Sequence, residues 1–156
     1  MRFRKSIALL ALTALLLVAL STVALADSEA TVSGRGWLAA RGTGTATLDM
    51  GGWIKMKIDG NVSINDFDGD LAVRIASSEA SLDQAESRFG PEIVLEEFEG
   101  YLAARGSHFL LRAEGTMKFK AHGHGFAYLV GEGAYKTRRG PVRTWDDATE
   151  GLDLAA

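Results

Sequence analysis

Glycine recurs along this chain at a nearly constant interval, and this interval limits how the chain can fold. When one glycine is taken from each cluster, neighbours are eight or nine residues apart. A step of that length fits a strand of about six residues and a turn of about two or three. These glycines are Gly34, Gly42, Gly51, Gly60 and Gly69, and then Gly106, Gly115, Gly123 and Gly131. The spacing predicts short strands separated by glycine turns.

The segments between these glycines alternate between apolar and polar residues. TATLDM at 45–50, WIKMKI at 53–58, LAVRI at 71–75 and MKFKA at 117–121 each place their apolar side chains on one face. Alternation with a period of two is typical of half-buried strands and does not fit a helix. The chain is therefore predicted to be almost entirely β.

One stretch of sequence occurs twice in a nearly identical form. GWLAARG at 36–42 matches GYLAARG at 100–106, and the match extends over 36–60 and 100–123 once one residue is dropped. The shared letters LAARG favour internal duplication over chance similarity between strands. Two related multi-strand halves would pack face to face or close into one barrel.

The predicted fold is all-β, a mainly antiparallel β-sandwich or closed barrel of about nine to eleven short strands. The dipeptides Gly51-Gly52 and Asp59-Gly60 favour the antiparallel form, because they supply the positive φ angles of tight hairpins. The alternative is a β-solenoid, in which the step of eight or nine residues would be half a coil.

The segment SSEASLDQAESRFGPE at 77–92 lacks this alternation. Ser81 followed by Gln84 resembles a helix-capping pattern, and Gly90 and Pro91 would end the helix. A short helix, or a structured excursion between the two halves, is expected here.

The first residues have the layout of a secretory signal peptide. MRFRK precedes an apolar run from Ile7 to Leu20, and ALA at 24–26 offers a cleavage site. The alternative is a retained membrane anchor, because the run is nearly long enough to span a bilayer. We therefore expect residues 1–26 to be removed from an exported protein that is periplasmic, on the cell surface or secreted, with membrane contact only through an uncleaved leader.

Residues 27–156 are expected to form one domain, because a chain of this length buries about two-thirds of its unfolded surface. The tail after Arg143 is expected to fray unless Trp145 packs on the body.

Without the leader, the chain has fourteen Lys and Arg and twenty Asp and Glu. That balance argues against a nucleic-acid partner, which requires clustered cations. The absence of cysteine excludes disulfides.

The run FEGYLAARGSHFLLRAEGTMKFKAHGHGFAYLVGEGAY at 98–135 resembles a group of small exported bacterial proteins. In these proteins, strands are separated by Gly-x-Gly turns. The resemblance implies export and an all-β fold. It implies no activity and no functional residue.

The three histidines are His108, His122 and His124. In an extended strand, HGHG places His122 and His124 on one face, within reach of one divalent metal ion, and His108 could approach from the preceding strand. The alternative is that two exposed histidines flank glycines in a turn. A His-x-His pair supplies only two ligands, so no cofactor is expected apart from this possible metal.

The sequence NDFDGD at 65–70 offers alternating carboxylates, of the kind that calcium prefers. Leu71 stands where the calcium loop requires glycine, and Ser77 stands where it requires a bidentate glutamate. Asn, Asp and Gly also favour turns for backbone reasons. An acidic turn is the favoured interpretation.

Neither a nucleophile elbow nor a phosphate loop occurs in the sequence, and we expect no enzyme.

The aromatics Trp37, Trp53 and Tyr101 are candidate ligand-binding residues, because rings beside polar residues suit sugar or peptide surfaces. The alternative is that they pack across strands without a ligand.

Three functions follow from these features. The favoured one is a non-enzymatic structural or interaction module of the cell envelope or extracellular space, which self-associates through sheet edges or contacts an envelope glycan or protein. The second is a module that binds a glycan, a peptide or a small ligand. The third is a metal-binding protein that uses the His-x-His pair.

Overall fold

The computed structural model describes residues 29–82, 90–145 and 149–153. The predicted leader at 1–26 lies outside this part of the chain. The elements are β1 (Glu29–Asp66), β2 (Ala72–Ala76), α2 (Glu79–Leu82), β3 (Glu92–Thr137), β4 (Arg143–Thr144) and β5 (Thr149–Asp153). They form one sheet in the order β2-β3-β1-β5, with β4 paired to β3.

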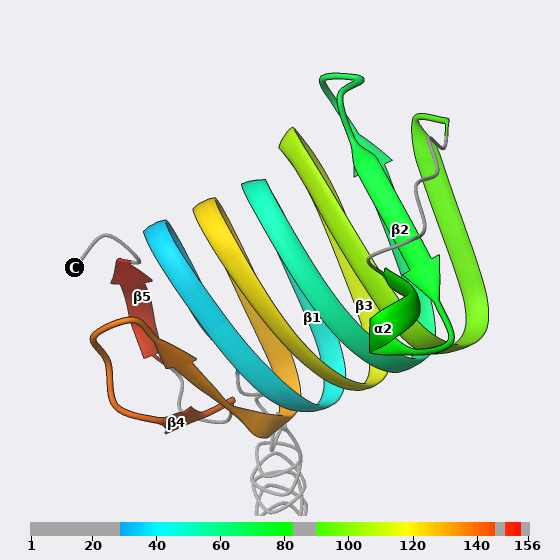
Figure 1. The fold of residues 1–156 in the computed structure, drawn as a ribbon. Coiled ribbons are helices and arrows are strands. Elements are labelled where there is room, and N and C mark those ends of the chain that lie inside the picture. The colour runs from blue at the N-terminus through cyan, green and yellow to red at the C-terminus, as the bar shows by residue number, and fades with distance from the viewer. Residues whose placement is uncertain (1–28, 83–89, 146–148, 154–156) are drawn as a thin grey trace, which may run out of the picture.

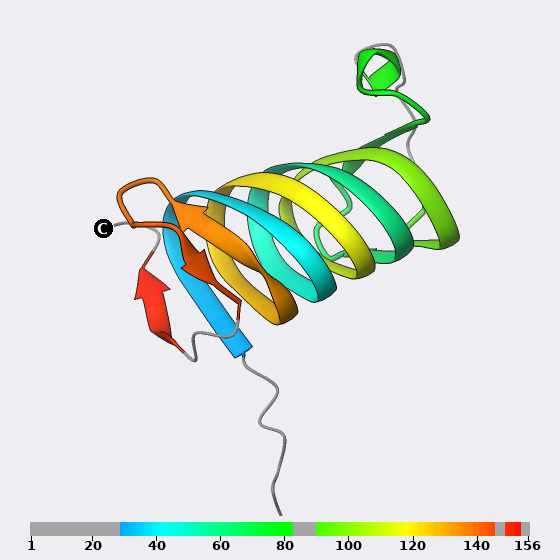
Figure 2. The same ribbon diagram turned by 90° about the horizontal axis from the view of Figure 1, so that it is seen from below.

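The strands β1 and β3 are antiparallel and wind together as successive turns of one open coil (Figures 1 and 2). Leu38 of β1 pairs both with Ala121 and with Thr137 of β3, sixteen residues further on. Gly52 pairs both with Gly106 and with Gly123, seventeen residues apart. One turn of β3 therefore takes sixteen or seventeen residues, and a turn of β1 lies between two turns of β3.

Glycines with positive φ bend β1, and β3 from Gly115 onward, about every eight residues. Gly52 (φ 136°) pairs with Gly123 (φ 155°), so two bends lie side by side. A Cβ added at Gly52 would meet the carbonyl oxygen of His122, and one at Gly123 would meet that of Gly51. Glycine is required for both reasons, the φ angle and the close backbone approach. Similar bends lie at Gly36, Gly44 and Gly60 of β1 and at Gly115 and Gly131 of β3. They flatten the coil into two opposed faces.

The apolar residues of the alternating segments fill the interior of the flattened coil, as the sequence predicts. Along β1 the buried side chains fall at even positions on both sides of the Gly44 and Gly52 bends. The eight-residue step between bends preserves the alternation, because eight is even. The core is one cluster that includes Leu48, Ile54, Met56, Leu102, Phe109, Leu111 and Phe119.

The prediction of an all-β, antiparallel fold is confirmed, but two of its details are wrong. The sheet does not close into a barrel. The expected short strands and hairpins are instead two continuous strands of 38 and 46 residues. Gly51-Gly52 and Asp59-Gly60 lie inside β1, where positive φ turns the strand through a bend and leaves it paired on both sides. The solenoid alternative had the period right, since each eight-residue step is half a coil.

The two copies of the repeat lie on different strands and alternate in space. Residues 36–60 belong to β1 and residues 100–123 to β3. Because a turn of β1 lies between two turns of β3, the copies interleave within one coil. They do not form two separate halves that pack on one another.

The coil carries additions near each end. α2 covers part of the expected helical segment and begins before the predicted cap, so Ser81 lies inside it; Ser81 N–H donates to the carbonyl of Ser78 at 3.1 Å. Residues 83–89, which include Gln84, lie outside the described part of the chain. At the other end, Trp145 is fully buried and its backbone N–H donates to Gly133 O at 3.0 Å. Trp145 thus anchors the segment that contains β4.

Replacing Gly52 with alanine should lower the free energy of unfolding by about 2–3 kcal/mol, because the new Cβ meets strained φ and a backbone oxygen together. Urea denaturation followed by far-UV circular dichroism measures this. Gly90→Ala is the matched control, because nothing lies within 4 Å of its added Cβ, and it should change stability by less than about 0.5 kcal/mol. Equal stability of the two variants would contradict the bend model.

Candidate functional site

In the part of the chain that the structure describes, several exposed cations gather on one outer face of the flattened coil. This basic face consists of the outward side chains of segments 37–43, 53–59, 99–105 and 116–122, with Lys136 beside them. At its centre lies a group that we call the basic cluster: Arg41, Lys55, Lys57, Lys118 and Lys120. All five of these side chains are exposed.

The register of β1 and β3 places the basic cluster in two rows that cross the strands. In the first row, Lys118 pairs with Arg41 on one side and with Lys57 on the other. In the second row, Lys120 pairs directly with Lys55. Side chains directly opposite in an antiparallel sheet have Cβ atoms about 4.5–5.5 Å apart. Each row therefore brings like charges into direct proximity.

This arrangement opposes folding. Like charges directly opposite one another destabilise a sheet by up to about 1 kcal/mol per pair. Within the described ranges, no ion pair with an acidic side chain relieves the five cations. A surface that served only solubility would intersperse the two signs of charge. The basic cluster is thus a place where the fold accepts an unfavourable interaction, as functional sites do.

The three aromatics proposed from sequence all lie on the basic face. Trp37 and Trp53 pair with His122 from its two sides, and the rings of Trp53 and His122 stack with centroids 5.9 Å apart and planes at 15°. Lys57 Nζ lies 5.7 Å from the centre of the Tyr101 ring. Trp53 remains 39% exposed. The aromatics border the basic cluster and are not buried among core residues.

A hollow of about 570 Å³ lies over the four lysines of the cluster. Its floor includes Trp53, Tyr101 and the four lysines of the cluster, and α2 contributes Glu79 and Leu82 to its wall. Leu82 is 2% exposed. The basic face is therefore a recess with one raised side, formed by α2 in front of the coil (Figure 1).

An acidic margin bounds the basic cluster beside the paired bends at Gly60 and Gly115. Asp59 follows Lys57 on its strand and pairs with Glu99 and Thr116. Thr116 in turn contacts Thr43, with their hydroxyl oxygens 3.1 Å apart. The cations thus lie between an aromatic row and a polar, partly acidic row.

The structure does not bring the three histidines together as a metal site. His122 stacks on Trp53, whereas the His124 ring lies against Gly51 on the far side of the Gly123 bend. His108 Nε2 lies 2.9 Å from Asp49 Oδ1, and its ring packs on Phe67. In the part of the chain that the structure describes, no three His, Cys, Asp or Glu residues lie close enough to hold a metal ion.

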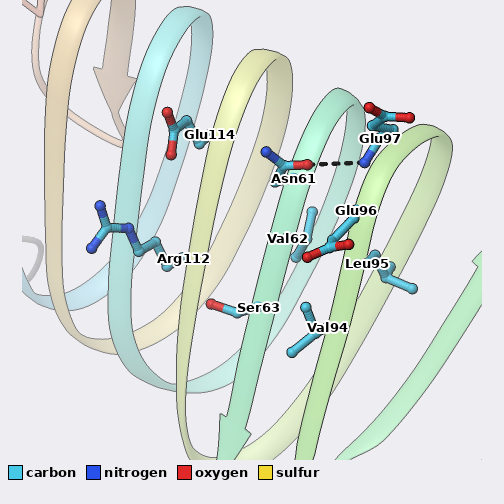
Figure 3. A pocket seen from close by; sticks show the side chains of 9 residues that line it. All are labelled: Asn61, Val62, Ser63, Val94, Leu95, Glu96, Glu97, Arg112 and Glu114. Atoms are coloured by element: carbon cyan, nitrogen blue, oxygen red, sulfur yellow. Dashed lines mark hydrogen bonds between the residues drawn. The ribbon is translucent and has the colours of Figure 1, made fainter.

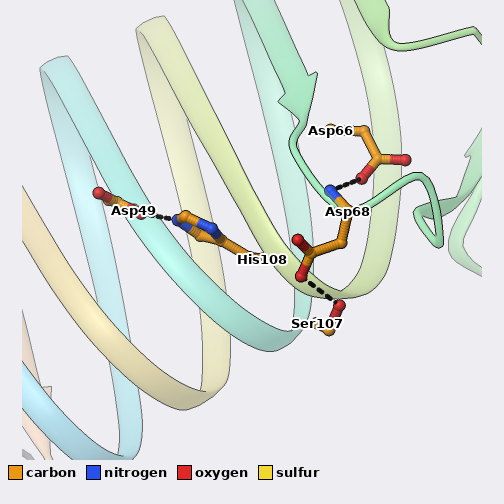
Figure 4. A network of polar contacts seen from close by, with 5 residues as sticks. All are labelled: Asp49, Asp66, Asp68, Ser107 and His108. Carbon is orange, nitrogen blue, oxygen red and sulfur yellow. Dashed lines mark hydrogen bonds and ion pairs between the residues drawn. The ribbon is translucent and has the colours of Figure 1, made fainter.

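The acidic segment 65–70 is the turn that the sequence favoured. Asp66 accepts hydrogen bonds from the backbone N–H groups of Asp68, Gly69 and Leu71, so its carboxylate closes the loop on itself. Asp68 accepts a hydrogen bond of 2.7 Å from the Ser107 hydroxyl (Figure 4). These carboxylates join the loop to a bulge of β3, where Ser107 and His108 lie opposite the single residue Gly51.

The opposite outer face has a second hollow, but its charges are mixed. It is lined by Asn61, Val62, Ser63, Val94, Leu95, Glu96, Glu97, Arg112 and Glu114 (Figure 3). Glu97 has φ 50° within a bulge, and its N–H donates to Asn61 Oδ1 at 2.9 Å. Its charged side chains are Glu96, Glu97, Glu114 and Arg112, so the hollow carries both signs of charge.

Comparisons with known proteins assign no function to the chain. No known protein family matches the chain, and no curated protein matches it. Within residues 29–82, 90–145 and 149–153, the structure has no helix that is long and apolar enough to cross a membrane.

The sequence pattern indicates the aromatics of this face but not the cluster of cations. Lys55 and Lys57 are visibly on the outer side of their strand, as are Lys118 and Lys120. The available signal was that IKMKI and MKFKA are equivalent segments of the repeat. Only the register of β1 against β3 shows that the two lysine pairs face each other.

Lys118→Gln should stabilise the protein, because it removes the cation that Arg41 and Lys57 both face. We expect an increase of about 0.5–1 kcal/mol in the free energy of unfolding at low ionic strength, shrinking as salt screens the charges. Urea denaturation at two salt concentrations measures it. Lys136→Gln is the control, because Lys136 pairs with Ala39 and should show little change. Destabilisation by Lys118→Gln would contradict the repulsion.

The Asp70 carboxylate should titrate below its ordinary range. The Ser107 N–H donates to Asp70 Oδ1 at 2.9 Å, and this hydrogen bond holds the pKa of Asp70 below its ordinary value. The resulting stabilisation is present above the pKa of an unfolded Asp and is lost as pH falls through the lower folded value. NMR titration of the Asp70 carboxyl carbon measures its pKa. Asp70→Asn should remove the part of the acid dependence of stability that this carboxylate contributes.

The matched variant for the Asp70 titration is Ser107→Ala, which keeps the backbone donor and should leave the Asp70 pKa below its ordinary value. A carboxyl that titrates at or above the ordinary value in the unaltered protein would show that this hydrogen bond does not form.

Proposed function

We propose that the protein is an exported, non-enzymatic interaction module that binds an acidic glycan through its basic face. The observation that carries the proposal is the basic cluster, in which cations face cations without a described ion pair. An anionic ligand would replace the repulsion among these side chains with attraction. The chain is acidic as a whole, with a net charge of −3, so the cluster is a local feature and not a consequence of composition.

The aromatics favour a glycan over other polyanions. Trp37, Trp53 and Tyr101 border the cations and give a sugar ring apolar surface to pack on. α2 rises beside the cluster, which hinders a flat bilayer surface from reaching the lysines. The predicted leader would bring the protein to a compartment in which acidic glycans, and not nucleic acids, are the expected polyanions.

The form of the sheet edges supports binding more than assembly by strand addition. In the described residues, β2, β4 and β5 at the ends of the coil have only five, two and five residues. The edge at 92–98 carries three glutamates and a bulge. Short strands, charges and bulges all discourage pairing with a second copy.

Polygalacturonate should bind the purified protein at low salt, with an affinity that falls as salt rises. Lys118→Gln/Lys120→Gln should weaken binding at least about tenfold, equivalent to about 1.4 kcal/mol. Isothermal titration calorimetry measures it. The control Arg112→Gln/Arg139→Gln changes the net charge equally but lies outside the basic face, so it should bind like the unaltered protein.

Three outcomes would overturn the proposal. One is the absence of polygalacturonate binding at low salt. Another is an equal loss in both double variants, which would indicate bulk charge. The third is a preference for anionic phospholipid vesicles or for oligothymidylate over polygalacturonate, which would assign the face to a membrane or to nucleic acid.

A further inference from the structure

We propose that the glycan lies across the strands, along the axis of the coil, and carries an anionic group on each successive sugar. This inference rests on the proposed function and specifies its ligand. The arrangement of cations on the basic face differs along the strands and across them.

Across the strands, the cations form the longer uninterrupted run. Arg41, Lys118 and Lys57 occupy three neighbouring strand segments in one row. Neighbouring strands lie about 4.7–4.9 Å apart. A pyranose ring is of comparable length, so a chain with one carboxylate per sugar keeps step with this row. The next position in the row is Tyr101, whose ring already contacts Lys57.

Along each strand, the run of cations is short. Lys118 and Lys120 are followed by His122 in one direction and by Thr116 in the other. Their spacing is about 6.6–6.8 Å, twice the rise per residue. The Gly115 and Gly123 bends then turn the strand away from the face. A polyanion that followed a strand would therefore meet two cations before it reached a bend.

The borders of the basic cluster confine a ligand to the same direction. On one side runs the aromatic row of Trp37, His122 and Trp53. On the other side Asp59 and Glu99 would repel a polyanion. Between these borders lies a lane two residues wide, parallel to the coil axis, that holds every cation of the cluster.

The test is the dissociation constant of defined oligogalacturonates of increasing length. We expect affinity to rise with each added sugar until the row is spanned, and then to level off. Arg41→Gln shortens the row at its end, so affinity should level off about one sugar earlier. Lys120→Gln removes a cation beside the row without shortening it, so affinity should fall at every length while the levelling length stays the same.

The outcomes separate this inference from the proposed function. If polygalacturonate does not bind, the function itself fails. If it binds but Arg41→Gln leaves the levelling length unchanged, or Lys120→Gln shifts it, only the orientation is overturned. A hexamer methyl-esterified at alternate sugars should bind at least tenfold more weakly than the free acid; equal binding would overturn the requirement for a charge on each sugar.

Discussion

The paired glycine bends are the constraint on which the rest of this structure depends. A two-stranded ladder of this length would twist without enclosing a core, and the bends at Gly52 and Gly123 fold it back on itself. Because bends on neighbouring strands coincide, backbone hydrogen bonding continues across them. The interior then forms from side chains of two opposed faces, and the outward side chains are sorted onto two surfaces of different charge.

The alternation of residues fixes the inward and outward positions, and sequence analysis recovers these well. It fails at the glycines because positive φ serves a hairpin and a bend equally. Which of the two forms depends on whether the next segment finds partners on both sides, a long-range property that local sequence does not contain.

The candidate site shows the same division between local and long-range information. Trp37, Trp53 and Tyr101 were identifiable as outward aromatics on equivalent or lysine-bearing segments. The proximity of Lys55 to Lys120 was not, since it requires the register between strands whose order along the coil is interleaved. The metal hypothesis assumed a straight strand, which would place His122 and His124 on one face. The bend at Gly123 instead gives the two side chains different surroundings.

The location of the lysines bears on why the repulsion among them is retained. Lysines on sheet edges commonly protect a protein against strand addition. Lys118 and its neighbours have a different position, since they lie on central turns of the coil with both sides of their strands already paired. Edge protection therefore does not account for them, and neither does solubility, which mixed charges would serve without the cost to stability. Under the proposed function, an anionic ligand supplies the negative charge that this face lacks in the free protein.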